Sequence, residues 1–240
     1  MRCSNAIAAL LWLAAATFAD GINTNSALPV GEGTLVSRTQ ARRADLDSEV
    51  DRYLASQTFA YGASGRLTYF ASLGYVWNRP GPDGLTDLAL FGRYRFFARD
   101  AKRQTLSFSA ILGAELPTGQ GFIGGDSAGA ILGLVGTWAK RDWTIDTDFV
   151  RSFRFDDADS TRANLAVSYA VHATKKLQLV GVLEANYRRD GSEDVLFVSP
   201  GLQLQLRGVI LEASFQVRAL EDAARPTARH VVVLGVRFVF

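Results

Sequence analysis

Charged side chains recur at alternate positions inside segments that are otherwise apolar, as in Arg93 and Arg95 or in Asp146 and Asp148. In a β-strand, residues two positions apart point to the same face, so each such pair would lie on one side of a sheet. A face with both signs of charge can form ion pairs and can orient the hydroxyl or carboxylate of a small molecule. Applied to the whole chain, this alternation predicts one charged face: Arg66, Asp87, Arg93, Arg95, Glu115, Asp146, Asp148, Arg154, Arg162, Glu184, Arg188, Glu212, Arg218 and Arg237.

Residues that could support catalysis are sparse. The two histidines, His172 and His230, fall on opposite faces, and only His172 has a serine, Ser168, on its own face. This is a poor candidate for a Ser-His hydrolase. Asp146 and Asp148 could hold a cation, but arginines on the same face are simpler partners, and no metal-ligand spacing or phosphate-binding motif is present. We therefore expect no enzymatic activity, no metal and no cofactor.

The elements that position these residues are about twelve segments with strict two-residue alternation. In the segment 176–188, leucines at 177, 179 and 183 share one face, while Gln178, Glu184 and Arg188 share the other. No convincing helix interrupts the series. The expected strands are 34–42, 49–62, 65–77, 85–98, 104–117, 127–140, 143–155, 161–173, 176–189, 195–207, 209–219 and 228–240.

The segments between these strands alternate between short turns and longer, mostly acidic loops, as in an up-and-down outer-membrane barrel. Large aromatic residues fall near both ends of the strands on the apolar face, where lipid headgroups would lie. The expected fold is all-β: a single antiparallel up-and-down transmembrane β-barrel of about 12 strands with short periplasmic turns. The alternative is a secreted β-sandwich or soluble barrel whose apolar face is its own core.

Both ends of the chain agree with a location in the outer membrane of a Gram-negative bacterium. Residues 1–19 resemble a cleaved secretory signal peptide, with small residues before the cut at Ala19. The only cysteine, Cys3, lies within it, so we expect no disulfide in the mature chain. The aromatic end at Phe238 and Phe240 suits a closing strand, and we expect Phe240 to engage the barrel-assembly machinery.

Three regions follow from this interpretation: the signal peptide 1–19, a flexible N-terminal segment 20–33 and the barrel 34–240. The segment 20–33 is polar, with Pro29, Gly31 and Gly33, and either trails in the periplasm or folds into the barrel as a small plug. Without the signal peptide's Arg2, the mature chain has 26 − 1 = 25 basic and 24 acidic residues. This balance gives no reason to expect a nucleic-acid partner. The expected partners are outer-membrane lipid and small solutes.

Two local features interrupt the regular pattern. The glycine-rich loop 117–125 contains Pro117, Thr118, Gly119, Phe122 and Ile123, and forms either a constriction at the barrel mouth or a plain flexible loop. Pro200 lies inside the strand 195–207, where proline removes a hydrogen-bond donor. We expect a bulge or local break there, which either bends the strand or opens the wall toward lipid.

The segments 84–96 and 113–119, which read GLTDLALFGRYRF and GAELPTG, resemble the MetA-pathway phenol-degradation family of outer-membrane proteins. The resemblance is sharpest over 55–125. It implies a barrel that acts as a channel for hydrophobic compounds. The positions that match the family pattern are Asp87, Arg93, Arg95, Glu115, Pro117, Thr118 and Gly119.

The predicted interior is part charged and part apolar, which leaves two functions open. One is a passive conduit for small hydrophobic or aromatic solutes, in which apolar groups lower the barrier and charges orient polar groups. The other is a non-conducting barrel that serves as a scaffold or partner-binding surface. The expected solute path is lined by Phe70, Asp87, Phe91, Arg93, Arg95, Glu115, Glu184, Glu212, Arg218 and Arg237.

Overall fold

The computed structural model describes residues 21–46, 51–120, 123–155, 158–174, 176–191, 193–222 and 228–240. The expected signal peptide, 1–19, therefore lies outside the described residues. The strands are Leu35–Leu46 (β1), Asp51–Gly62 (β2), Leu67–Arg79 (β3), Gly84–Leu85 (β4), Leu88–Ala101 (β5), Gln104–Leu116 (β6), Gly129–Lys140 (β7), Trp143–Arg154 (β8), Ser160–Ala173 (β9), Leu177–Asp190 (β10), Glu193–Leu206 (β11), Val209–Asp222 (β12) and Ala228–Val239 (β13).

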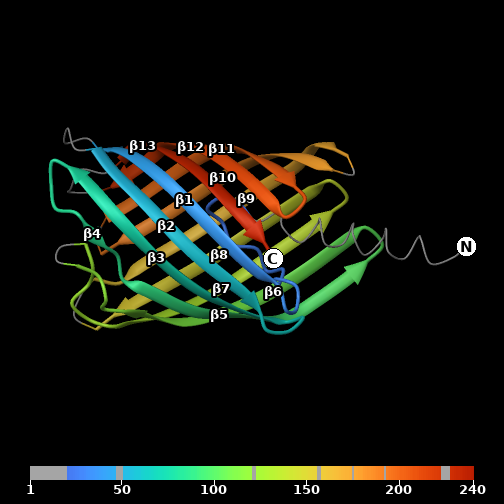
Figure 1. The fold of residues 1–240 in the computed structure, drawn as a ribbon, viewed down its shortest axis with the longest axis horizontal. Coiled ribbons are helices and arrows are strands. Elements are labelled where there is room, and N and C mark those ends of the chain that lie inside the picture. Colours follow the sequence, from blue (N-terminus) through green and yellow to red (C-terminus); the bar gives the residue numbers. More distant parts are fainter. Residues whose placement is uncertain are drawn as a thin grey trace, which may run out of the picture.

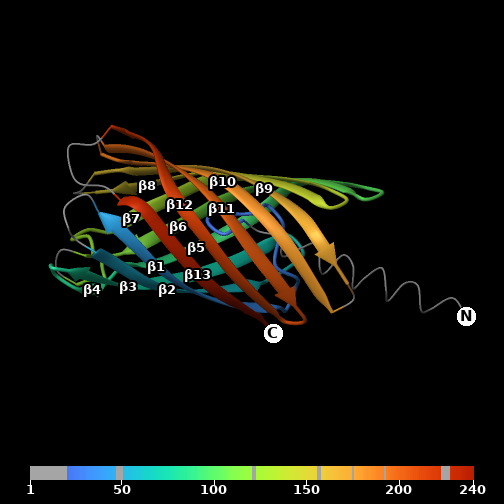
Figure 2. The same cartoon turned by 90° about the horizontal axis from the view of Figure 1, so that it is seen from above.

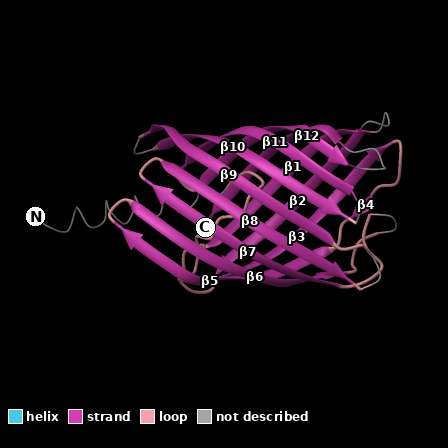
Figure 3. Ribbon diagram, turned by 180° about the vertical axis from the view of Figure 1, so that it is seen from behind, coloured by secondary structure: helices cyan, strands magenta, loops and turns pink. Residues whose placement is uncertain are grey.

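These strands form one closed ring. Every ring strand pairs in antiparallel fashion with its neighbours along the chain, and β1 pairs with both β2 and β13. The two-residue β4 is a side branch on β3, so thirteen strands less this one leave a barrel of twelve. Figures 1 and 3 show the strands slanting in a common direction around the ring. The expected antiparallel barrel is confirmed, and most predicted boundaries lie within a few residues of those observed.

Burial along the strands is inverted relative to a water-soluble protein. On the outer surface Leu112 is 67% exposed and Leu134 is 59% exposed, whereas Asp146 and Glu184 inside are 0% and 1% exposed. Because successive residues of a strand face opposite sides, one register sends Leu112 and Leu134 outward and Asp146 and Glu184 inward. This arrangement is stable when the outer solvent is hydrocarbon.

The two ends of the barrel differ, as the alternating connections predict. The turn end carries the short connections 63–66, 102–103, 141–142, 174–176 and 207–208 together with the C-terminus (Figures 1 and 2). The loop end carries the longest connection, between Leu116 and Gly129, but also the short one between Asp190 and Glu193, which the sequence had placed among the longer loops. Aromatic side chains are exposed near the turn end, where the rings of Trp143 and Tyr169 lie with centroids 4.6 Å apart. Among the described residues, no helix is long and apolar enough to cross a membrane.

Irregularities in the ladder change which side chains face outward. In β5 the pairing with β6 skips Phe96, so this extra residue and Phe97 are both exposed on the outer surface. Around Pro200, the register of β11 with β10 and with β12 is the same before and after the proline. Only residues 199 and 200 lack a pairing with β12. Pro200 therefore marks a local break, and the register shift in β11 lies between Leu196 and Phe197.

Candidate functional site

We call residues 21–33 the luminal segment: residues 21–30 lie inside the barrel, and 31–33 are exposed at the turn end, where Gly33 donates to the carbonyl of Gly62 (Figure 2). Asn23 donates to Glu184 of β10 through its backbone amide, at 3.0 and 3.1 Å from the two carboxylate oxygens, and through its side chain at 2.6 Å. Asn25 donates in the same way to Asp148 of β8, with its backbone amide at 2.6 Å. Two buried wall carboxylates therefore accept the hydrogen bonds of this segment.

The second half of the luminal segment crosses toward β3, β5, β6 and β7. The backbone amide of Ala27 donates to Thr137 at 2.7 Å, and its carbonyl accepts from Ser109 at 2.8 Å. Farther along, Arg93 donates to the carbonyl of Leu28 at 2.7 Å, and Val30 donates to the hydroxyl of Thr68 at 3.1 Å. Of the two arrangements expected for the segment, the described residues therefore lie within the barrel, and their backbone groups find partners on the lumen wall, as buried amides and carbonyls require. The expected flexibility of 20–33 stays a prediction.

Apolar side chains fix the luminal segment as well. Ile22 is buried against Val231 and Val233 of β13. Ala27 is buried in a second cluster with Ile111, Ile131, Val135 and Val150. The inward-facing valines and isoleucines, unusual for a water-filled pore, thus serve in part to seat this segment.

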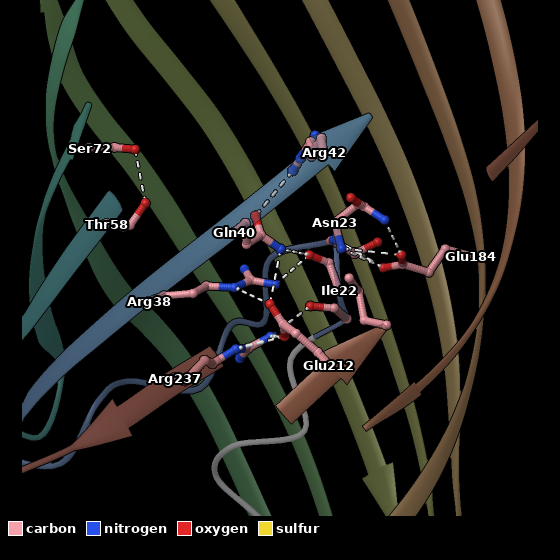
Figure 4. A network of polar contacts seen from close by, with 12 residues as sticks. Ile22, Asn23, Arg38, Gln40, Arg42, Thr58, Ser72, Glu184, Glu212 and Arg237 are labelled. Atoms are coloured by element: carbon pink, nitrogen blue, oxygen red, sulfur yellow. Dashed lines mark hydrogen bonds and ion pairs between the residues drawn. The ribbon is translucent and has the colours of Figure 1, made fainter. Parts of the chain in front are cut away.

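A charged cluster on β1, β12 and β13 holds the start of the luminal segment (Figure 4). Glu212 is bound by Arg38 at 2.7 Å, by Arg237 at 2.8 Å and by Gln40 at 3.0 Å. A Cβ on Gly235 would collide with the Glu212 side chain, so glycine makes room for the acid. Arg38 and Gln40 also donate to the carbonyl of Ile22. Because the ion pairs are buried, losing one partner would leave an uncompensated charge.

A cavity of about 510 Å³ lies beside the luminal segment and extends to residues near the loop end. Asn23 and Leu28 form part of its lining on one side, and Asp87 and Ile123 on another. The rings of Phe70 and Phe91 stack along its wall, with centroids 4.6 Å apart and planes 7° apart.

The guanidinium of Arg93 lies 5.0 Å from the centre of the Phe70 ring. Phe70, Phe91 and Arg93 thus place an apolar surface and a cation next to each other. Flat aromatic molecules with a polar substituent can use both features.

The predicted constriction loop is tied to the barrel wall. The backbone amides of Gly119 and Gly125 donate to the two carboxylate oxygens of Asp87, at 3.0 and 2.7 Å. Thr118 accepts from the amide of Leu88 at 2.9 Å, which anchors the loop directly after Pro117. Ile123 lines the cavity, while Phe122 lies outside the described residues. Whether the loop gates the mouth stays a prediction.

The predicted lumen residues separate into three groups. The cavity wall contains Phe70, Asp87, Phe91, Arg93, Glu115 and Arg237. Glu184 and Glu212 are buried beneath the luminal segment. Arg95 and Arg218 do not line this cavity: Arg95 donates to the carbonyl of Gly65 in a turn, and Arg218 pairs with Glu221 at the loop end. Their place on the solute path stays a prediction.

Sequence reasoning left out Arg38, Gln40 and Arg42 of β1, which all line the cavity. Their spacing of two was the available signal, because it places three polar residues on one face of a strand. Arg154, Arg162 and Arg188, read as inward-facing, also lie on the wall. Glu115 binds Arg154 at 3.2 Å and Ser152 at 3.1 Å.

In the described part of the chain, the residues considered for hydrolysis or metal binding do not form a catalytic or metal site. His230 lies 4.0 Å from Asp45 near the loop end, with its ring against Phe215. The hydroxyl of Ser168 has no hydrogen-bond partner within the described residues. Within those same residues, no three His, Cys, Asp or Glu side chains are grouped to hold a metal ion.

Comparison with known families gives a match to the model described as "Putative MetA-pathway of phenol degradation", over residues 23–230. The chain belongs to this family. The match includes most of the luminal segment as well as the barrel. A search of curated protein sequences gave no match for this member of the MetA-pathway phenol-degradation family.

Solved structures share the fold of this family member. The COG4313 outer membrane channel from Pseudomonas putida F1 is 16% identical, with a TM-score of 0.68 over 92% of this chain and 99% of that one. The NanC porin is 11% identical, with a TM-score of 0.53 over 85% of this chain and 98% of that one. The barrel of this MetA-pathway phenol-degradation family member is thus the fold of known outer-membrane channels.

Proposed function

We propose that the protein is a passive outer-membrane conduit for small hydrophobic or aromatic solutes, closed in the described state by its luminal segment. The observation that carries this proposal is the cavity in which the Phe70–Phe91 stack lies beside Arg93. The family description supports it by naming the degradation of phenol, an aromatic compound with one polar group.

The outer surface supports the membrane location. Exposed leucines form an apolar band, and aromatic residues lie near the turn end, as in barrels embedded in a bilayer. We propose that Phe240, at the end of the closing strand, is the contact for the barrel-assembly machinery during insertion. We place the turn end in the periplasm, because the short turns of outer-membrane barrels lie on that side. Solutes then enter the cavity from the loop end, which faces the outside of the cell.

Passage beyond the cavity requires the luminal segment to move. Its contacts with the wall are hydrogen bonds and the packing of Ile22 and Ala27. Water can replace each hydrogen bond, at a net cost of about 1.5–3 kcal/mol where the partner is a charged group. Its covalent continuation into β1 keeps it attached while it shifts. A segment held in this way can act as a closing element without unfolding the barrel.

A second function has its own support. The luminal segment contacts β1, β3, β5, β6, β7, β8, β10 and β13, and such a filled lumen suits a non-conducting scaffold whose outer loops bind a partner. The two functions differ in whether removing the segment produces a pore.

Planar-bilayer recordings separate these functions. The mature chain, residues 20–240, is compared with a chain of residues 31–240, both refolded in detergent, and phenol is then added to the bath. A conduit gives rare openings for 20–240 and steady conductance for 31–240, and phenol reduces the current. Silence from both chains favours the scaffold, and a current that phenol does not change argues for an unselective pore.

A further inference from the structure

Two arginines face each other directly across a strand pair on the cavity wall. The register of β9 and β10 places Arg162 opposite Arg188, and both line the cavity. Like charges directly opposite each other destabilise a sheet. Arg188 is partly neutralised by Asp190 at the loop end. Arg162 forms no ion pair or hydrogen bond with the described residues, although Asp148 attracts its charge.

A third arginine, Arg42 of β1, lines the same cavity. One of its terminal nitrogens donates to Gln40 at 3.2 Å, but its Nε is buried and has no hydrogen-bond partner among the described residues. The positive charges of Arg38 and Arg162 repel that of Arg42, whereas the negative charges of Glu184 and Glu212 attract it. A buried donor of a charged group without an acceptor is costly, so an acceptor from outside the chain would stabilise it.

The acids nearest to these arginines are already engaged. Glu184 accepts hydrogen bonds from Asn23 and Thr24 of the luminal segment. Asp148 accepts from Asn25 and from Asn164. Within the described residues, these two carboxylates therefore accept no hydrogen bond from Arg42 or Arg162, although the negative charge of Glu184 attracts Arg42 and that of Asp148 attracts Arg162.

We propose that Arg42 and Arg162 form a carboxylate-binding subsite in the cavity and that the solute is a small aromatic acid. A carboxylate has two coplanar oxygens that match guanidinium donors, so it can accept from the orphaned Nε of Arg42 and reduce the repulsion from Arg162. Phe70 and Phe91 line the same cavity and offer a surface for the ring. This inference rests on the proposed function and narrows its substrate class.

Binding of benzoate to the refolded mature chain in detergent, measured by isothermal titration calorimetry, tests the subsite without requiring transport. Benzyl alcohol is the uncharged probe of similar size, and inorganic phosphate is the anion without a ring. We expect benzoate to bind more tightly than both. Arg42→Gln and Arg162→Gln should each weaken benzoate binding at least about tenfold, as for the loss of one hydrogen bond to a charged group. Arg99→Gln, at the exposed turn end of β5, should leave it unchanged.

Other outcomes overturn the subsite. Equal affinity for benzoate and benzyl alcohol shows that charge plays no part, and phosphate binding as tight as benzoate shows a general anion site. The result is separate from conduction. A barrel that binds benzoate but stays silent contradicts the conduit alone, whereas one that passes phenol without preferring benzoate contradicts the subsite alone.

Discussion

Glu184 on β10 accepts hydrogen bonds from both the backbone amide and the side-chain amide of Asn23, 161 positions earlier in the chain. Asp148 holds Asn25 in the same way on β8. These two carboxylates lie on one stretch of the wall, where only β9 separates their strands, and both are buried. The position of the luminal segment therefore depends on acids that the strand pattern turns inward.

Replacing Glu184 by alanine should open the barrel. The substitution removes the acceptor of Asn23 and Thr24, and hydrogen bonds to a charged group contribute about 1.5–3 kcal/mol each. Loss of even one shifts the closed state enough to raise the open probability about tenfold or more in planar-bilayer recordings. Glu32→Ala, which removes an exposed acid of the same segment, is the matched control and should match the wild type. Equal open probabilities for Glu184→Ala and the wild type would show that the segment is not the closing element.

A disulfide between positions 26 and 137 should lock the barrel closed. The hydroxyl oxygens of Ser26 and Thr137 lie 3.1 Å apart, and the mature chain expected from the sequence has no other cysteine. The oxidised Ser26→Cys/Thr137→Cys variant should show no openings, and a reductant should restore them. The single variant Ser26→Cys should not respond to the reductant. Conductance that is the same in the oxidised and reduced double variant contradicts the prediction.

Removal of the Asp87 carboxylate should release the loop 117–125. The amides of Gly119 and Gly125 lose their acceptor in Asp87→Ala, so their hydrogen exchange should speed up about tenfold or more. Asp83→Ala, which removes the acceptor of the Asn78 amide in a different loop, should leave the exchange of 119–125 unchanged. If Asp87→Ala also increases the current block by phenol, the loop limits access to the cavity. Unchanged exchange would mean that the carboxylate does not hold the loop.

An arginine on the outer surface should destabilise the barrel in lipid. Leu134 is exposed in the middle of β7, between Ala110 and Phe149 on the neighbouring strands. Leu134→Arg should lower the free energy of unfolding in phospholipid vesicles by about 2–4 kcal/mol, as measured by urea titration. Ser56→Arg, on the cavity wall, should have a smaller effect because its charge meets a polar lumen. If Leu134→Arg lowers the free energy of unfolding less than Ser56→Arg does, the face that carries Leu134 does not contact lipid.

The sequence by itself determined which residues face lipid and which face the lumen. Side-chain direction alternates with a period of two, and leucine at 177 and 179 against Gln178 is a local pattern that needs no knowledge of the partner strand. The family resemblance and the closed barrel follow from such local information. Depth along the barrel does not follow from it, so the alternation could not tell that Arg95 and Arg218 lie outside the lining of the cavity.

Only the tertiary structure decided where the luminal segment lies. Its polar, aperiodic sequence has no preference between a periplasmic tail and a plug. Its amides find their acceptors on Glu184, Asp148 and Thr137, which lie more than 100 positions away in the chain. Closure of the ring brings those acceptors into one lumen and places Arg42 and Arg162 on the wall of the same cavity. Contacts between residues so far apart in the chain depend on the register and curvature of all the strands between them, and no single segment determines these.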